Sequence, residues 1–464
     1  MTEPSIIPRA EHPISRKDID PDALRVLYRL NENEYTAYLV GGSVRDLLLG
    51  RRPKDFDIGT DAHPYEIKKL FRNCWIIGRR FRLAHIKYGA KTIEVATFRQ
   101  NVPEPPPASA MDAQAPVDDQ PVLVHSDEAP PRRGHADEHG IVRRDNIYGT
   151  PEEDAFRRDF TINALFYDIA THSVIDYAGG LEDLRHRRIV SIGDPTVRFT
   201  EDPVRMLRAA VFAARLDFEM DEAVLSAIDS HGALIQKASP ARLLEEYFKI
   251  LRSGYAEATF RVLDGVGLLG LMTPELQDAP DAFWASLARL DAWRRHHPSI
   301  PAEMVNPVLM GALLMPLGVV NPHEDQLTLG MLTLPRKDYE RLRHLLITVP
   351  KLADSNLPVR IARGLPGRPS FSDAITWLDI FGDAPDAVAH WKHVQSQMPK
   401  PEPRPQHRGH SHRPHPTPPG APGHAAEHPA GHHAEGAPPS GDPAKRRRRR
   451  RRRRGGRGNT ATGQ

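Results

Sequence analysis

Two carboxylates stand two residues apart in this chain, at Asp55 and Asp57, with Phe56 between them and Ile58 after them. If the segment is a strand, residues i and i+2 share a face, so both acids project together while Phe56 and Ile58 face the core. Two carboxylates that close repel each other unless a cation lies between them, and Mg²⁺ is the cation that bridges carboxylates to phosphates. An isolated Asp-x-Asp is ordinarily solvated surface, so the pair needs support from its surroundings.

That support comes from a glycine turn just before the acids. An apolar run of strand type, residues 38–40, ends in Gly41-Gly42, and a short helical pattern follows until Gly50 closes it as a C-cap. Glycines after a strand let the backbone approach a phosphate, and the new helix directs unpaired N–H groups at it. Arg45, in the first turn, adds a charged fork. A Gly-Gly pair alone is usually a turn, but both features within twenty residues favour a nucleotide site.

Here a family resemblance becomes specific, because the order of the residues matters as well as their types. The stretch Leu39-Val40-Gly41-Gly42-x-Val44-Arg45-Asp46, followed by Asp55-x-Asp57, resembles the head of the polymerase-β-type nucleotidyltransferases. Within them it resembles the branch that holds the tRNA CCA-adding enzymes and the bacterial poly(A) polymerases. The resemblance implies an α+β fold, with a mixed sheet and flanking helices in the head, followed by an all-α neck and arm.

A second motif begins at a predicted helix start, where Thr150 can cap, Pro151 fits the first turn and Glu153 completes a capping box. We expect that helix to carry the residues through Asp159. By itself Arg157-Arg158-Asp159 is ordinary surface charge. As part of Glu153-Asp154-x-x-Arg157-Arg158-Asp159-Phe160-Thr161-Ile162-Asn163-Ala164 it resembles the second family motif. The resemblance implies that Asp159 is an active-site residue and that Arg158 contacts the nucleotide.

A third motif opens a strongly helical stretch near residue 204. Asp202 precedes Pro203 at the N-cap position, and Arg205 and Arg208 are three apart on one face. An acceptor and several donors on one edge suit the Watson–Crick edge of a base, although an ordinary Asp–Arg helix pair explains the same residues. The resemblance favours the first interpretation, because Glu-Asp-x-x-Arg is the family's base-recognition motif. It also implies that Arg208 contacts the nucleotide.

Two further features bear on the active site. Gly78-Arg79-Arg80-Phe81-x-Leu83-x-His85 is similar to the signature that separates bacterial poly(A) polymerases from CCA-adding enzymes, and it makes Arg79, Arg80 and Arg82 RNA-binding candidates. By charge alone a solvated basic turn is equally open. Glu94 lies between apolar residues of a predicted strand over 92–98. It faces either solvent or the metals, and both alternatives stand.

Composition indicates the compartment and the charge balance. The net charge is +3, but residues 401–464 hold 14 Lys/Arg and 4 Asp/Glu, which leaves the first 400 residues at −7. An acidic body must bind an anionic partner through local patches. The single cysteine, Cys74, excludes an internal disulfide and fits a buried structural thiol in a reducing cytoplasm. No signal peptide or membrane-spanning stretch is recognisable, so we expect a cytoplasmic protein without a membrane partner.

The remaining sequence suggests how the chain is divided. Proline and charge at the start predict a flexible leader, and Pro, Ala, Asp and His around 100–140 predict a disordered insertion. Later stretches have helical spacing broken at prolines that include Pro335 and Pro350, with no alternating strands. The end is rich in Pro and His, and the arginine run 446–454 would bind any nucleic acid. The predicted parts are leader 1–20, head 21–178, base-recognising neck 179–275, RNA-binding arm 276–398 and disordered tail 399–464.

Together these features predict a template-independent polynucleotide adenylyltransferase that transfers AMP from ATP to RNA 3′ ends, an RNA-polyadenylation role in mRNA processing. Asp55 and Asp57 would hold two Mg²⁺ ions with the ATP, Asp159 would complete the site, and Asp202, Arg205 and Arg208 would select adenine. RNA-degradation or RNA-chaperone proteins are candidate partners. A CCA-adding tRNA nucleotidyltransferase is the alternative with the same chemistry. A non-catalytic RNA-binding protein is the alternative of another class, and the intact Asp55 and Asp57 argue against it.

Overall fold

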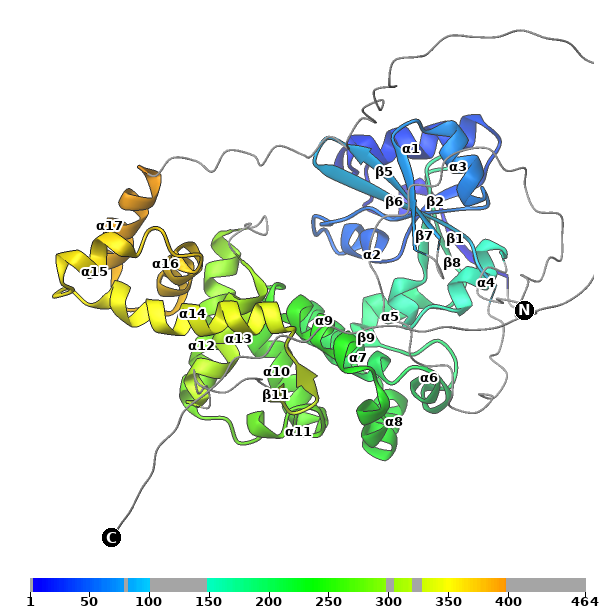
Figure 1. Ribbon diagram of the computed structural model, residues 1–464. Helices are drawn as coiled ribbons and strands as arrows, with labels where there is room; N and C mark the ends of the chain where they lie inside the picture. The colour runs from blue at the N-terminus through cyan, green and yellow to red at the C-terminus, as the bar shows by residue number, and fades with distance from the viewer. Residues whose placement is uncertain (1–2, 79–81, 101–147, 298–303, 319–327, 398–464) are drawn as a thin grey trace, which may run out of the picture. The chain divides into compact units, whose positions relative to one another are not determined.

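The computed structural model describes residues 3–78, 82–100, 148–297, 304–318 and 328–397. The predicted 100–140 insertion, apart from residue 100, and the predicted tail after 397 lie outside the described residues. Figure 1 shows the elements in chain order. The strands and helices up to residue 201 are β1 Ser5–Ile7, α1 Pro21–Glu32, β2 Ala37–Val40, α2 Gly42–Leu48, β3 Ile58–Thr60, α3 Pro64–Leu70, β4 Cys74–Ile77, β5 Leu83–Tyr88, β6 Lys91–Thr97, α4 Pro151–Phe156, β7 Leu165–Asp168, β8 Ser173–Asp176, α5 Gly180–His186, β9 Arg188–Ile189 and α6 Pro195–Glu201.

The later elements are mainly helical. They are α7 Val204–Leu216, β10 Glu219–Met220, α8 Glu222–His231, α9 Pro240–Leu251, α10 Ala256–Gly265, α11 Leu268–Met272, α12 Asp281–His296, α13 Asn306–Leu314, β11 Thr328–Leu329, β12 Leu332–Thr333, α14 Arg336–Ala353, α15 Val359–Gly364, α16 Phe371–Phe381 and α17 Pro385–Ser396. The predicted fold class is therefore confirmed: a mixed sheet with flanking helices precedes a helical portion.

The sheet has eight strands in the order β1-β8-β7-β2-β3-β6-β5-β4. Only the β3–β6 pair is parallel, so the sheet is mixed. Neighbouring residues of β2 point to opposite faces, because Leu39 joins the core beneath α1 and α3 whereas Val40 joins a smaller core with Phe98 and Phe166. The central strands β2 and β3 thus place the glycine turn and the paired acids at one end of the strands, in a sheet that has an apolar core on each face.

Local signals explain the helix that packs on this sheet. Asp20 caps α1 by accepting from the backbone of Asp22, and Pro21 occupies its first position. Ala23, Val26, Leu27 and Leu30 are fully buried at helical spacing, so α1 presents one apolar stripe to the sheet. The same apolar spacing, with Pro21 at the start, is the pattern that predicts a helix from the sequence, and the helix ends at Glu32.

The predicted flexible leader is wrong for its described residues. β1 pairs antiparallel with β8, with Ile6 opposite Ile175, and thereby covers a sheet edge that would otherwise expose unpaired backbone groups. Farther along, the Nε2 of buried His12 lies 2.9 Å from the carbonyl oxygen of His172. Proline and charge in the sequence did not reveal this pairing, because its partner lies about 170 residues away.

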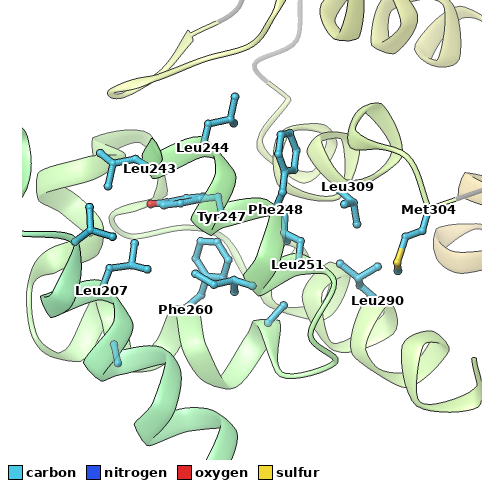
Figure 2. Packing of buried hydrophobic residues seen from close by; sticks show 14 of the residues in the cluster. Leu207, Leu243, Leu244, Tyr247, Phe248, Leu251, Phe260, Leu290, Met304 and Leu309 are labelled. Atoms are coloured by element: carbon cyan, nitrogen blue, oxygen red, sulfur yellow. The ribbon is translucent and has the colours of Figure 1, made fainter. Parts of the chain in front are cut away.

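The helical portion has a continuous core centred on α9. Tyr247 packs edge-to-face on Phe260 of α10 with ring centroids 5.4 Å apart, and its hydroxyl lies 3.0 Å from that of Thr273. Figure 2 shows Tyr247 and Phe260 with Leu207 of α7 and Leu309 of α13. Because α7 is packed into this core, its polar edge is held in a fixed position.

Two expectations about the region after 276 are corrected. β11 and β12 form a short antiparallel hairpin where only helices were predicted. Pro350 does not break a helix but lies inside the last turn of α14. Buried Leu345, Val349 and Leu352 hold that turn against its neighbours, so packing outweighs the cost of the proline.

Cys74 of β4 is buried, and burial raises the pKa of its thiol to about 11. The prediction of a structural rather than a reactive thiol agrees with this environment. In the part of the chain that the structure describes, no helix combines the length and apolar character needed to cross a bilayer.

Candidate active site

The glycine turn between β2 and α2 is built so that two distant groups can approach its backbone. Gly41 has φ +68° and ψ −127°, a conformation that side chains rarely adopt. A Cβ on Gly41 would lie 2.8 Å from Nη1 of Arg158 and 3.4 Å from the carbonyl oxygen of Asn163. Glycine is therefore required both by the backbone angle and by the close passage of Arg158.

Asp55 and Asp57 lie beside this turn, but not in a strand as the spacing suggested. Both precede β3, which begins at Ile58. Ile58 is buried and Phe56 packs partly against the core, so the predicted inward-facing positions are correct. The backbone carbonyl of Asp57 accepts from the N–H of Val40 at 3.1 Å, which ties the acids to the residue before Gly41.

The Asp57 carboxylate sits among other negative charges. Although Asp57 keeps access to solvent, the surrounding protein atoms, then Glu94 and Asp55, raise its pKa to about 6, and Arg158 partly opposes the rise. Glu94 comes from β6, which pairs in parallel with β3 so that Val95 is opposite Ile58. Its side chain is half exposed, with Oε1 3.5 Å from Nε2 of His85. The structure thus places Glu94 beside Asp57.

This donor set suits Mg²⁺. Among the described residues, no three His, Cys, Asp or Glu side chains converge closely enough to enclose a metal by themselves. Mg²⁺ does not need such a cage, since it commonly binds one or two carboxylates, water and substrate phosphates. Burial, and then repulsion from Glu94 and Asp55, raise the pKa of Asp57, an environment in which a bound cation would stabilise the carboxylates. Asp55 and Asp57, with Glu94 nearby, therefore fit the ion that the sequence predicts.

Arg157, Arg158 and Asp159 lie in the turn after α4, not within the helix as expected, because α4 ends at Phe156. The capping box of Thr150 and Glu153 is confirmed. Arg158 folds back so that Nη2 lies 2.8 Å from Asp154 Oδ2, and Nη1 donates to the carbonyl of Asn163 at 3.1 Å. It is the one predicted nucleotide contact that lies against Gly41 and acts on Asp57.

Asp159 is held by partners instead of facing Asp55 and Asp57. Its Oδ2 accepts from Arg208, and its Oδ1 accepts from Asn163 Nδ2 at 3.1 Å and from the Phe160 N–H at 2.9 Å. Burial raises the pKa of this carboxyl, but Arg208 and Asn163 more than offset the rise and lower the pKa overall. The arrangement fits a positioning role, and the assignment of Asp159 to the active site stays a prediction.

The side chain of Arg45 does not take the direction that the sequence analysis predicted. It is only 2% exposed, its Nε and Nη2 donate to Asp46 Oδ1 at 2.9 and 2.7 Å, and Nη1 donates to Asn163 Oδ1 at 2.5 Å. The guanidinium is directed into the protein and braces the glycine turn, so the predicted fork toward phosphate is not formed. Asn163 joins Arg45 to Asp159 by hydrogen bonds to both. Apart from the position of Asn163 in the second motif, nothing in the sequence predicts this contact.

Each of the three predicted base-recognition residues pairs with a different charged side chain. Asp202 accepts from both Nη atoms of Arg242 at 2.9 and 2.6 Å, Arg205 Nη1 donates to Glu201 at 2.9 Å, and Arg208 pairs with Asp159. Asp202 Oδ1 also accepts from the Val204 N–H at 3.2 Å, but α7 has Pro203 as its N-cap, so Asp202 lies one residue before the N-cap and not at that position as predicted. Sequence analysis missed Arg242, since nothing local connects α9 with Asp202.

The predicted RNA contacts are described only in part. Arg79 and Arg80 lie outside the described residues. Arg82 lies over the ring of Tyr65, with its guanidinium carbon 5.6 Å from the ring centroid. That contact is available for a stacking partner but does not by itself identify one.

Comparisons with known proteins agree with this geometry. The mixed sheet, the glycine turn and the paired acids define a nucleotidyltransferase fold. Residues 37–190 match the family described as the poly A polymerase head domain, and residues 217–279 match the probable RNA and SrmB-binding site of polymerase A. Over these segments the chain is similar to poly(A) polymerases.

Individual relatives are similar to a little over half of the chain. Poly(A) polymerase I of Escherichia coli O6:H1 is 48% identical over 259 residues, 56% of this chain and 51% of that protein. The CCA-adding enzyme of Lactobacillus helveticus is 34% identical over 264 residues, 57% of this chain and 56% of that protein. The chain thus matches only about half the length of these relatives. The crystal structure of the Bacillus stearothermophilus CCA-adding enzyme with CTP has the same fold, with a TM-score of 0.55, 24% identity and 82% coverage of both chains.

Proposed function

We propose that the protein is a template-independent polynucleotide adenylyltransferase, which transfers AMP from ATP to RNA 3′ ends and releases pyrophosphate. The observation that carries the proposal is the position of Arg158, which lies against Gly41 and within electrostatic reach of Asp57. A triphosphate with its metals needs a cationic fork, a close backbone and paired carboxylates in one place.

In this proposal each group of the chain has a defined task. Asp55 and Asp57 would hold two Mg²⁺ ions, which would lower the pKa of the RNA 3′-hydroxyl and stabilise the departing pyrophosphate. Gly41 and Gly42 keep the backbone open to the phosphates, and Arg158 orients them. Arg45 and Asn163 brace the turn from behind, while Asp159 fixes Arg208.

Adenine selection is assigned to the edge formed by Asp202, Arg205 and Arg208. In the observed conformation Asp202 gives acceptors to Arg242, so base reading falls first to the arginine donors. An N–H donor matches the N1 acceptor of adenine, and a carboxylate held by Arg242 keeps lone pairs for the amino group of adenine.

We propose that the head covers residues 21–178, the neck 179–275, the RNA-binding arm 276–398 and the basic tail 399–464, and that the protein works in the cytoplasm. RNA-degradation or RNA-chaperone proteins remain proposed partners.

The first experiment measures nucleotide preference. The purified full chain is incubated with a generic RNA 3′ end, Mg²⁺ and each of the four nucleoside triphosphates in turn. ATP should be incorporated well ahead of the other three, and chelation of Mg²⁺ should stop the reaction. Asp55→Ala should abolish incorporation yet leave RNA retention largely unchanged. Full activity of that variant would remove the metal assignment.

CCA addition is the second candidate, favoured by the 34% identical CCA-adding relative and the shared fold. It is tested with tRNA that lacks its terminal CCA. Ready use of CTP and restoration of the CCA end would replace the poly(A) assignment. The higher identity to the poly(A) polymerase relative, 48%, is the reason for ranking adenylyl transfer first.

A further inference from the structure

The turn after α4 carries an arginine with no assigned task. Arg157 precedes Arg158, and Arg198 of α6 clamps both residues from behind. Arg198 Nη2 donates to the carbonyl oxygens of Arg157 at 2.8 Å and of Arg158 at 2.6 Å. Arg198 itself is buried, with 6% of its surface exposed. The backbone of this turn is therefore fixed, and the two arginine side chains leave it in defined directions.

Positive charge around the turn exceeds negative charge. Arg157 and Arg158 share Asp154, with closest contacts of 3.5 and 2.8 Å. Arg198 and Arg205 share Glu201, at 3.0 and 2.9 Å. Within the described part of the chain, four guanidinium groups are thus paired with two carboxylates. A half-buried cluster in which arginines outnumber their paired carboxylates is stabilised by binding an anion.

Arg157 is the member of the cluster best placed to receive that anion. Arg158 takes Asp154 Oδ2 through two donors, whereas the Arg157 contact with Oδ1 is the longest of the four pairs. About a third of the Arg157 side chain, 32%, is exposed. Burial and the neighbouring charges of Arg99, Arg158 and Arg205 lower the pKa of its guanidinium, although Asp154 opposes them. The group is therefore accessible, held in place and short of negative charge.

We propose that Arg157 binds a backbone phosphodiester of the RNA substrate close to its 3′ end; the proposal rests on the proposed function. Arg158 lies against Gly41, and its charge acts on Asp57, so we assign it to the nucleotide. Arg157 is not among the charges that act on Asp57, so it is open to a second anion. The planar fork of arginine suits the two free oxygens of a phosphodiester.

The test compares the full chain with Arg157→Ala and Arg157→Lys. Arg25→Ala is the matched control, because Arg25 also pairs with an aspartate three residues earlier, at 2.7 Å, but on α1. Affinity for a short unstructured oligoribonucleotide is measured over a range of salt concentrations, together with KM for RNA and for ATP. We expect Arg157→Ala to weaken RNA binding about tenfold and to reduce the salt slope by about 1, with KM for ATP within about twofold. Arg157→Lys should keep the slope and lose part of the affinity.

Three results for Arg157→Ala would overturn the inference: a salt slope equal to that of the wild type, a loss of RNA affinity no greater than in Arg25→Ala, or a raised KM for ATP with unchanged RNA affinity. The last would assign Arg157 to the triphosphate. Arg157→Gln, which keeps part of the side chain, replaces the alanine variant if the latter does not fold. A wild-type chain that binds RNA but incorporates no nucleotide would contradict the proposed function, while a reduced slope in Arg157→Ala would still support the phosphate site.

Discussion

Arg208 of α7 donates from Nε to Asp159 Oδ2 at 2.7 Å, and its Nη2 lies at the same distance from that oxygen. The Asp159 side chain is 11% exposed, and Asn163 and the Phe160 N–H satisfy its other oxygen. The pair joins the second sequence motif to the third. Because Asn163 also accepts from Arg45, the contact continues to the glycine turn. Residues separated widely in sequence therefore form one hydrogen-bonded chain behind the proposed nucleotide site.

Removing Arg208 would leave the buried Asp159 carboxylate without its positive partner and should destabilise the fold. We expect Arg208→Ala to lower the free energy of unfolding by about 2 kcal/mol, the penalty for a buried charge that has lost its partner. The double variant Asp159→Asn with Arg208→Ala should recover part of that loss but no activity. Urea unfolding measures all three proteins. Arg261→Ala, in an exposed pair with Glu257, is the control and should cost less than about 0.5 kcal/mol. Additive losses in the double variant would contradict the coupling.

The same pair predicts how stability depends on pH. Arg208 and Asn163 lower the pKa of Asp159 in the folded protein despite burial. A carboxyl whose folded pKa is lowered stabilises the fold above its unfolded pKa, near about 4, and loses that contribution as pH falls through the folded value. The advantage of the wild type over Asp159→Asn in urea unfolding should therefore be constant near neutral pH and shrink below about pH 4. A difference that grows on acidification would have the wrong sign.

Local signals predicted much of this fold. The apolar spacing of α1, the capping box of Thr150 with Glu153 and the bend at Gly41 each depend on residues within a few positions of one another. Such features are encoded in short stretches, and packing did not override them. The acids at 55 and 57 were also found, although alternation alone could not distinguish a strand from the extended segment before one.

Long-range partners could not be predicted in this way. Arg45 in the first turn of α2 has the same local appearance whether its guanidinium turns outward to phosphate or inward to Asn163, which is 118 residues away. Asp202 likewise acquires Arg242, 40 residues later, through the packing of α9. β1 finds β8 across nearly the whole sheet-forming region. Side-chain direction depends on tertiary contacts, which no spacing rule records.

Arg45→Lys tests the inward direction of Arg45. A lysine cannot reproduce the donors that reach Asp46 and Asn163 together, so we expect the free energy of unfolding to fall by about 2 kcal/mol. Arg51→Lys is the matched control, because the exposed Arg51 side chain donates to the backbone carbonyls of Arg215 and Leu216, and the change should alter stability by less than about 0.5 kcal/mol. Thermal and urea unfolding measure the change. Wild-type stability combined with a raised KM for ATP would instead restore a direct role at the phosphates.

Gly41→Ala and Gly50→Ala separate backbone strain from damage to the proposed site. Both glycines have positive φ, +68° and +65°, so each alanine should cost about 1–2 kcal/mol of stability. Only the Cβ at position 41 meets another group, Arg158 Nη1 at 2.8 Å, whereas position 50 has no atom within 4 Å. Displacement of Arg158 should lower kcat/KM for ATP by about a hundredfold in Gly41→Ala, and Gly50→Ala should retain activity. Melting temperatures and single-nucleotide incorporation, measured side by side, check both parts. Equal activity in the two variants would show that the close approach of Arg158 to the turn has no role in the reaction.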